Sequence, residues 1–123
     1  MKAISIRQPW ASWIARGEYV SGVFRQKTIE TRSWTTKHRG DLLIVSTKKP
    51  EWPHYPLGKA LCIVSLVDCR EMKASDEWDA MCSNTAHWPM PRYAWILENI
   101  RPIKPFPVKG QQRLYEVEIP DAV

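Results

Sequence analysis

The chain lacks the long apolar runs and the even set of cysteines that mark membrane-spanning and disulfide-stabilised proteins. None of its apolar stretches approaches the roughly 18 residues that a membrane-spanning helix needs. Arg7 and Gln8 interrupt the apolar run near the N-terminus, so a secretory signal is not expected there. The three cysteines are an odd count, and without an export signal we expect reduced thiols in a cytoplasmic protein with no membrane partner.

Common catalytic and cofactor-binding motifs are also missing. The sequence contains no G-x-S-x-G nucleophile motif, no Walker-type phosphate loop and no dinucleotide-binding fingerprint. Its three histidines and three cysteines show neither C-x-x-C nor H-E-x-x-H spacing. We therefore expect neither a metal site nor a cofactor.

What remains has the composition of one globular domain, which we expect to cover residues 1–123. Lysine and arginine number 18 against 13 aspartates and glutamates, for a net charge of +5. That excess is compatible with a polyanionic partner, but an ordinary solvated surface accounts for it as well. Seven tryptophans are unusual for this length; large aromatics mostly build cores, yet nucleic-acid bases also stack on them.

Apolar periodicity predicts about six strands and two short helices. Alternating or continuous apolar and β-branched residues indicate strands near residues 3–7, 28–34, 42–47, 59–69, 93–103 and 112–119. Trp10, Trp13 and Ile14 follow helical spacing between Pro9 and Gly17, and a second helix is expected to begin near Ser75. So many strands in a short chain usually curl into a closed or partly closed barrel, so we expect a mainly β, α+β fold.

The most distinctive segment is 27–40, K-T-I-E-T-R-S-W-T-T-K-H-R-G, which carries far more charge than a core strand. If 28–34 is a strand, Ile29 points to the core, and Glu30, Arg32 and Trp34 share the opposite face. Glu30 and Arg32 are then close enough to pair. Such a pair is either a surface ion pair of little energetic value or a device that holds an arginine fork toward a phosphate, carboxylate or base edge.

The basic turn that follows favours the second interpretation. Lys37, His38 and Arg39 would bring several cations close to Trp34. Ser46 and Lys48 end the next strand, where they either contact phosphates or form a plain strand-end turn.

The role of Lys27 is open at the level of sequence. A catalytic lysine must lose its proton near neutral pH. Neighbouring Arg25 and Arg32 favour the neutral amine, whereas Glu30 favours the ammonium form.

The order of these segments resembles the ASCH (activating signal cointegrator homology) domain of the PUA-like superfamily. The matching pieces are I-S-I-R-Q-P-W-A-S-W-I-A-R-G at 4–17, the segment 27–40, L-L-I-V-S-T-K-K at 42–49, G-K-A-L-C-I-V-S-L-V-D-C at 58–69 and F-P-V-K-G at 106–110. The resemblance implies a small PUA-like β-barrel with two short flanking helices and a cleft between barrel and helix. It also implies binding of RNA or DNA in a cleft lined by Gln8, Trp10, Arg32, Trp34, Arg39, Ser46 and Lys48, beside Lys27 and Glu30. The basic turn adds Lys37 and His38 to the expected binding residues.

One bacterial branch of this family is enzymatic and hydrolyses the amide of acetylated cytidine. Its motif is similar to K-x-x-T-x-R, with a catalytic lysine and threonine and a later glutamate. Here Lys27 and Arg32 match, but Glu30 stands at the threonine position, and Glu77 or Asp76 would be the later acid. In an enzyme of this kind, Glu30 would act as general base on a water and Lys27 would stabilise the oxyanion.

Three functions therefore remain open. The first is a nucleic-acid-binding module for RNA or single strands, with a polar cleft for a base or nucleotide. The second is an amidohydrolase acting on acetylated cytidine or a related modified nucleoside, with Lys27 and Glu30 as catalytic residues. The third is a protein-interaction domain, whose partners the sequence does not identify. Convergence of Lys27, Glu30 and Arg32 in one pocket would favour either ligand-binding function over the third.

Overall fold

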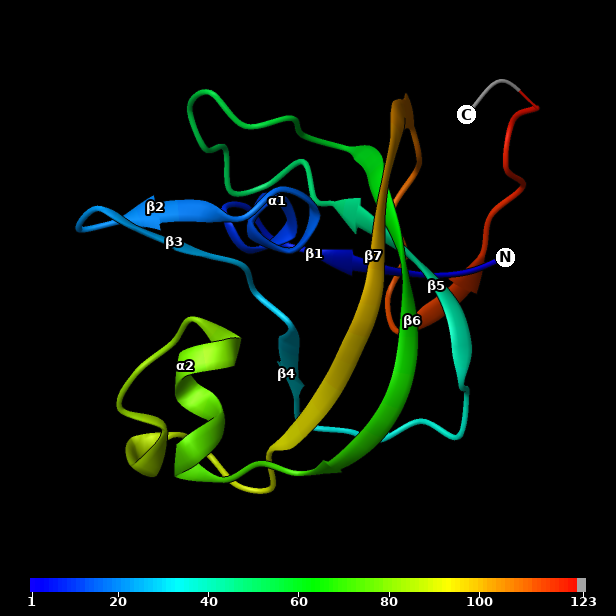
Figure 1. Cartoon of the computed structure of the whole chain (residues 1–123). Helices are drawn as coiled ribbons and strands as arrows, with labels where there is room; N and C mark the ends of the chain where they lie inside the picture. Colours follow the sequence, from blue (N-terminus) through cyan, green and yellow to red (C-terminus); the bar gives the residue numbers. More distant parts are fainter. Residues whose placement is uncertain (122–123) are drawn as a thin grey trace.

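A curled six-stranded sheet forms the body of the molecule, of which the computed structural model describes residues 1–121 (Figure 1). Its strand order is β4-β7-β6-β5-β1-β8, so β4 and β8 are the edges and the barrel is only partly closed. The β1–β5 pair is parallel and the other four pairs are antiparallel. The strands are β1 (Lys2–Ile6), β4 (Ile29–Arg32), β5 (Gly40–Ser46), β6 (Lys59–Glu71), β7 (Tyr93–Pro107) and β8 (Leu114–Glu116). This arrangement confirms the mainly β fold expected from the sequence.

The two longest strands, β6 and β7, bend the sheet. Their pairing shifts register three times, between Ala60 and Cys62, Ile63 and Ser65, and Leu66 and Asp68. Such irregularities bend a strand and increase its twist, which lets β7 reach from the edge strand β4 across the sheet. β7 also continues to Pro107, through a segment that the sequence indicated to be a connection, and β8 is correspondingly shorter than expected.

The main core lies between the sheet and α1 (Trp10–Ala15). Trp95 and Leu42 are almost fully buried there, against Ile14 and Ala11 of the helix. Cys62 belongs to the same core, and its burial raises the pKa of the thiol to about 12. At six residues α1 is too short to be stable alone, so this packing sustains it.

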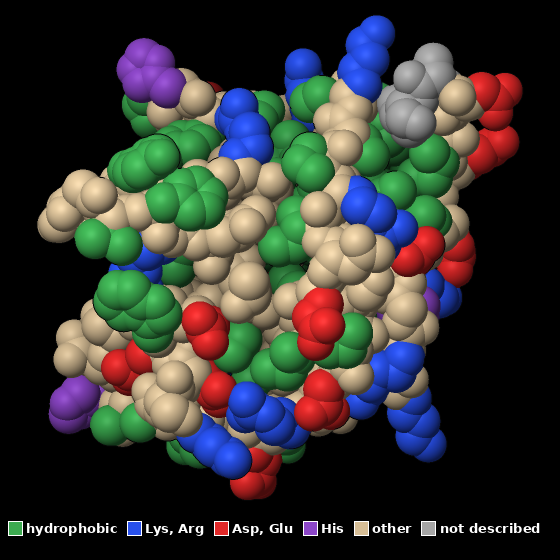
Figure 2. Space-filling view, viewed as in Figure 1, with side chains coloured by type: hydrophobic (Ala, Val, Ile, Leu, Met, Phe, Trp, Pro, Cys, Tyr) green, Lys and Arg blue, Asp and Glu red, His purple; other side chains and the backbone are tan. Residues whose placement is uncertain are grey.

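A hairpin of β2 (Glu18–Val20) and β3 (Val23–Arg25) follows α1 and was not anticipated from the sequence. Ser21 and Gly22 both have positive φ, 50° and 79°, as a two-residue hairpin turn requires. The Ser-Gly dipeptide between two short apolar runs was the available signal. The hairpin projects from the body, and hydrophobic side chains gather over it on the face seen in Figure 2. Its Tyr19 and Phe24 are exposed and pack edge-on against each other.

The second helical region lies beside β4 and comprises the 3-10 turn Ala74–Asp76, α2 (Glu77–Ala80) and a further 3-10 turn, Thr85–His87 (Figure 1). Asp76 anchors its start: its carboxylate accepts two 2.8 Å bonds from Arg70 and one from the Lys73 N–H. The Arg70 hydrogen bonds lower the pKa of Asp76, and burial opposes them only partly. None of the helices within residues 1–121 has the length and apolar character needed to cross a membrane.

Candidate functional site

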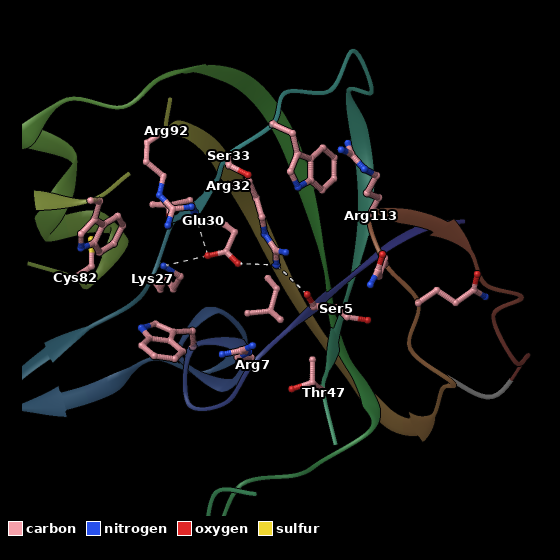
Figure 3. Close-up of a pocket in the computed structure, with 17 residues that line it drawn as sticks. Ser5, Arg7, Lys27, Glu30, Arg32, Ser33, Thr47, Cys82, Arg92 and Arg113 are labelled. Carbon is pink, nitrogen blue, oxygen red and sulfur yellow. Dashed lines mark hydrogen bonds and ion pairs between the residues drawn. The ribbon is translucent and has the colours of Figure 1, made fainter. Parts of the chain in front are cut away.

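A cavity of about 810 Å³ opens at the seam where the curled sheet fails to close (Figure 3). One wall comes from β1 and the start of α1, and the facing wall from β4 and the residues around it. The 82–92 region and the 111–113 segment complete the lining. In chain order the lining residues are Ser5, Ile6, Arg7, Trp10, Lys27, Glu30, Thr31, Arg32, Ser33, Trp34, Thr47, Cys82, Trp88, Arg92, Gln111, Gln112 and Arg113.

Lys27, Glu30 and Arg32 form a charged triad in this cavity, in which Arg32 is half-buried. The Lys27 Nζ lies 3.5 Å from Glu30 Oε1, and Arg32 Nη2 donates to Glu30 Oε2 at 3.0 Å. Lys27 is 2% exposed and Glu30 is 9% exposed, so neither charge is solvated as at a surface. The Lys27 ammonium also donates to the Ala80 carbonyl at 2.5 Å, which ties the triad to the end of α2. The sequence left the direction of Lys27 undecided, and the structure places it inside.

The environment of Glu30 keeps its carboxyl group ionised. Burial by itself would raise the pKa of Glu30, but Lys27, Arg32 and the backbone N–H of Thr31 together outweigh it and bring the pKa below the ordinary value of 4.5. The carboxylate at the centre of the triad is therefore ionised at neutral pH.

Two hydrogen bonds of the triad use backbone groups at the seam. Glu30 Oε1 accepts a 3.0 Å bond from the N–H of Thr31 in β4. Arg32 Nη2 donates a 2.8 Å bond to the carbonyl of Ser5 in β1. These side chains thus bridge two strands that are not neighbours in the sheet.

The rest of the lining adds positive charge and aromatic surface. Arg7, Arg92 and Arg113 line the cavity, whereas Glu30 supplies the lone carboxylate among the described lining residues. Arg113 lies over the ring of Trp34, with its guanidinium carbon 4.8 Å from the ring centroid. Three tryptophans, Trp10, Trp34 and Trp88, also line the cavity.

The structure brings Trp10, Arg32 and Trp34 together with Lys27 and Glu30, but it places other residues of the expected binding set elsewhere. Gln8 is fully buried and bonds to Ser12 and the Pro56 carbonyl, because its amide anchors the start of α1. Ser46 is also buried and bonds to the backbone of Lys59, and exposed Lys48 lies outside the lining.

The basic turn does not line the cavity either. Arg39 donates to the Thr36 and His38 carbonyls and lies 3.9 Å from the Asp68 carboxylate of β6, and His38 bonds to the Asp41 carbonyl at the start of β5. Exposed Lys37 is likewise outside the lining. The expected convergence of these cations on Trp34 is therefore not observed, and Arg113 takes that position.

Neither candidate for a later acid reaches the cavity. Asp76 is bonded to Arg70, and Glu77 accepts bonds from the hydroxyl and the N–H of Thr85. No cluster of three or more potential metal ligands occurs among residues 1–121.

Sequence reasoning missed the lining contributed by distant segments, in particular Arg7, Trp88, Arg92 and Arg113. Arg7 follows β1 directly, and the adjacent strand-to-helix signal could have marked it. For the others, isolated residues in loops, no local pattern was available.

Comparisons with protein families, sequences and solved structures all point to the ASCH domain. The family model for the ASCH domain matches residues 4–107. Activating signal cointegrator 1 from Homo sapiens is 31% identical over 138 aligned positions, and its Mus musculus counterpart is 30% identical. The alignments cover 94% of this chain but only 22% of those proteins. The crystal structure of ASCH from Zymomonas mobilis superposes with a TM-score of 0.68 at 16% identity, covering 95% of this chain and 87% of that one, which shows a shared fold.

Proposed function

The chain belongs to the ASCH domain family, and from that premise we propose that it binds RNA or another single-stranded nucleic acid, with a base or nucleotide held in the cavity at the seam. The PUA-like fold of this family is associated with nucleic-acid binding. The family alone does not select a ligand for this chain, and the support for one comes from the lining of the cavity.

The observation that carries the proposal is the cavity's combination of charge and aromatic surface. Five cationic side chains line it with one carboxylate among the described residues, and that carboxylate is already paired with two of the cations. The remaining three, Arg7, Arg92 and Arg113, are available to phosphates. Cations that neutralise phosphates supply most of the sequence-independent affinity of such proteins, and aromatic rings add base stacking.

The polar groups on the lining suit a base edge. Ser33 and Thr47 present hydroxyls, and Gln111 and Gln112 present amides, each able to donate and accept. Single-stranded RNA is read through such contacts to splayed bases, whereas a duplex hides those edges. The site therefore favours an unpaired strand.

We expect a fluorescently labelled ten-residue oligouridine to bind at low salt and to weaken steadily as salt is added. If Arg7, Arg92 and Arg113 each meet one phosphate, the slope of log K against log salt will be about −2, since each contact to a single strand contributes about −0.7. Fluorescence titration at several salt concentrations measures it. Absence of binding at low salt, or affinity indifferent to salt, would reject the proposal.

A second candidate function is hydrolysis of the acetyl amide of a modified cytidine. The burial of Lys27 and Glu30 in one cavity is the observation that favours it. In this function Glu30 would accept a proton from an attacking water, and the Lys27 ammonium would stabilise the developing oxyanion. Against it, both Glu30 oxygens already accept hydrogen bonds, and the lowered pKa of this carboxyl makes it a weak base.

If this second function holds, the protein will release cytidine from acetylcytidine, and Lys27→Ala will reduce the rate at least about hundredfold. Chromatography of the reaction mixture measures release, and circular dichroism verifies that the variant is folded. Lys104→Ala, a change of an exposed lysine on β7, is the matched control. Lack of release by the unmodified protein, or equal release by the Lys27 variant, would exclude the hydrolase.

A further inference from the structure

Two tryptophans of the cavity each carry an arginine on the ring. The Arg113 guanidinium carbon lies 4.8 Å from the Trp34 centroid, and that of Arg92 lies 5.0 Å from the Trp88 centroid. Figure 3 shows Arg92 and Arg113 on opposite sides of the Glu30–Arg32 pair. The cavity therefore has two separate arginine–tryptophan pairs with the charged triad between them.

Each pair has the components of a nucleotide subsite. The ring attracts a cation through its quadrupole, and the same π-face accepts a stacked base. The guanidinium is planar, so it either stacks on the other side of a base or swings to the adjacent phosphate. Within residues 1–121 no arginine lies over the ring of Trp10, which instead packs edge-on against Trp13 with the ring centroids 6.3 Å apart.

The cavity is large enough to hold more than one nucleotide. Its volume of about 810 Å³ is near the upper end of the roughly 300–1,000 Å³ found for pockets that hold one drug-sized ligand. A single base would leave one of the two pairs unoccupied.

We propose that the cavity is a two-base site, with one base on the Trp34–Arg113 pair, the next on the Trp88–Arg92 pair, and the linking phosphate across the charged centre. This inference rests on the proposed nucleic-acid binding and adds the smallest ligand that fills the site, a dinucleotide of a single strand. Longer strands gain contacts only outside the cavity.

A third pair supplies a matched control. The Arg25 guanidinium carbon lies 3.7 Å from the Trp78 centroid, a closer approach than in the cavity. Neither residue lines the cavity. Replacing Trp78 therefore removes an equivalent arginine–tryptophan contact without touching the proposed site.

The test compares uridine monophosphate, its 5′-phosphorylated dinucleotide and a ten-residue oligouridine at low salt by calorimetric titration. The dinucleotide is expected to bind at least about tenfold more tightly than the mononucleotide, since a second stacked base is added. Trp34→Leu and Trp88→Leu are each expected to abolish this difference in affinity between dinucleotide and mononucleotide. Trp78→Leu is expected to leave the difference unchanged. Thermal melting verifies that each variant is folded. Arg113→Gln leaves the Trp34 ring in place, and it is expected to weaken binding of the dinucleotide more than binding of the mononucleotide.

The outcomes separate the two proposals. If the ten-residue strand does not bind, nucleic-acid binding itself is wrong. If that strand binds but mononucleotide and dinucleotide bind equally, the two-base site is wrong and the binding function stands. The same conclusion follows if Trp78→Leu reduces the gain in affinity from mononucleotide to dinucleotide as much as Trp88→Leu does.

Discussion

Replacing Glu30 by glutamine is expected to lower the free energy of unfolding by about 3 kcal/mol at pH 7. The carboxylate lies between Lys27 at 3.5 Å and Arg32 at 3.0 Å, and Lys27 is only 2% exposed. Glutamine keeps the shape but removes the charge, so Lys27 stays buried without its anion, and the amide nitrogen or oxygen faces donors on both sides. Breaking one member out of a buried ion pair typically costs about 3–5 kcal/mol. Urea unfolding of both proteins at pH 7 measures the difference.

The loss should shrink in acid. The folded-state pKa of Glu30 lies below its ordinary value of 4.5, because Lys27, Arg32 and the Thr31 N–H together outweigh burial, the largest influence. The stabilisation by the carboxylate is therefore complete above about pH 4.5 and is lost as the pH falls through the lower folded-state value. Unfolding curves of the Glu30→Gln variant should depend less on pH below 4.5 than those of the unmodified protein.

Two comparisons make this test specific. Glu98→Gln changes an exposed carboxylate of β7 and should alter stability by less than about 0.5 kcal/mol. The double variant Lys27→Met with Glu30→Gln removes the buried cation as well, and it should recover part of the loss. A Glu30→Gln variant within about 1 kcal/mol of the unmodified protein would show that the triad is not the buried charge network described above.

The second large effect is expected on nucleic-acid affinity, from removing the three cavity arginines that lie outside the triad. A triple variant, Arg7→Gln with Arg92→Gln and Arg113→Gln, should weaken oligouridine binding at low salt about hundredfold and bring the salt slope close to zero. Phosphate contacts govern both quantities, so they should change together. Fluorescence titration across the same salt series measures them.

The matched control loses the same charge elsewhere. Lys49→Gln, Lys59→Gln and Lys104→Gln alter three exposed lysines outside the cavity lining. This variant should bind with nearly the original affinity. Equal weakening by both triple variants would mean that net charge, rather than the cavity, attracts the strand. A further variant, Lys37→Gln with Arg39→Gln, tests whether the basic turn takes part after all.

The Glu30–Arg32 pair of the charged triad was accessible from sequence because it is local. Strand alternation puts Glu30 and Arg32 on one face two residues apart, and the structure shows that pair at 3.0 Å. Lys27 was not accessible in this way, since it precedes β4 and its burial depends on the Ala80 carbonyl, 53 residues later. Strand alternation predicts the face on which a side chain of the strand lies, but it does not predict the burial of a residue that precedes the strand.

The rest of the site escaped prediction because it is assembled by topology. Arg113 comes from the approach to β8 and Trp88 from the loop before β7, and nothing near either residue indicates that both meet β4. The basic turn was misleading for the opposite reason. Its cations are local and conspicuous in the sequence, yet His38 and Arg39 bond to backbone carbonyls no more than three residues away. β7 was underestimated because prolines normally end a strand, whereas here irregular pairing accommodates them.

The side-chain bonds across the seam also bear on self-association. An unclosed sheet presents backbone donors and acceptors to which a strand of another molecule can add, and this is a route to aggregation. Here Glu30 accepts the N–H of Thr31 on the edge strand β4, and Arg32 donates to the carbonyl of Ser5, which lies in β1 beyond the last residue that pairs with β8. An intruding strand would have to break both bonds and bury its own backbone beside fixed charges. The side chains proposed to bind a nucleotide therefore also disfavour self-association of the unliganded protein through strand addition at this seam.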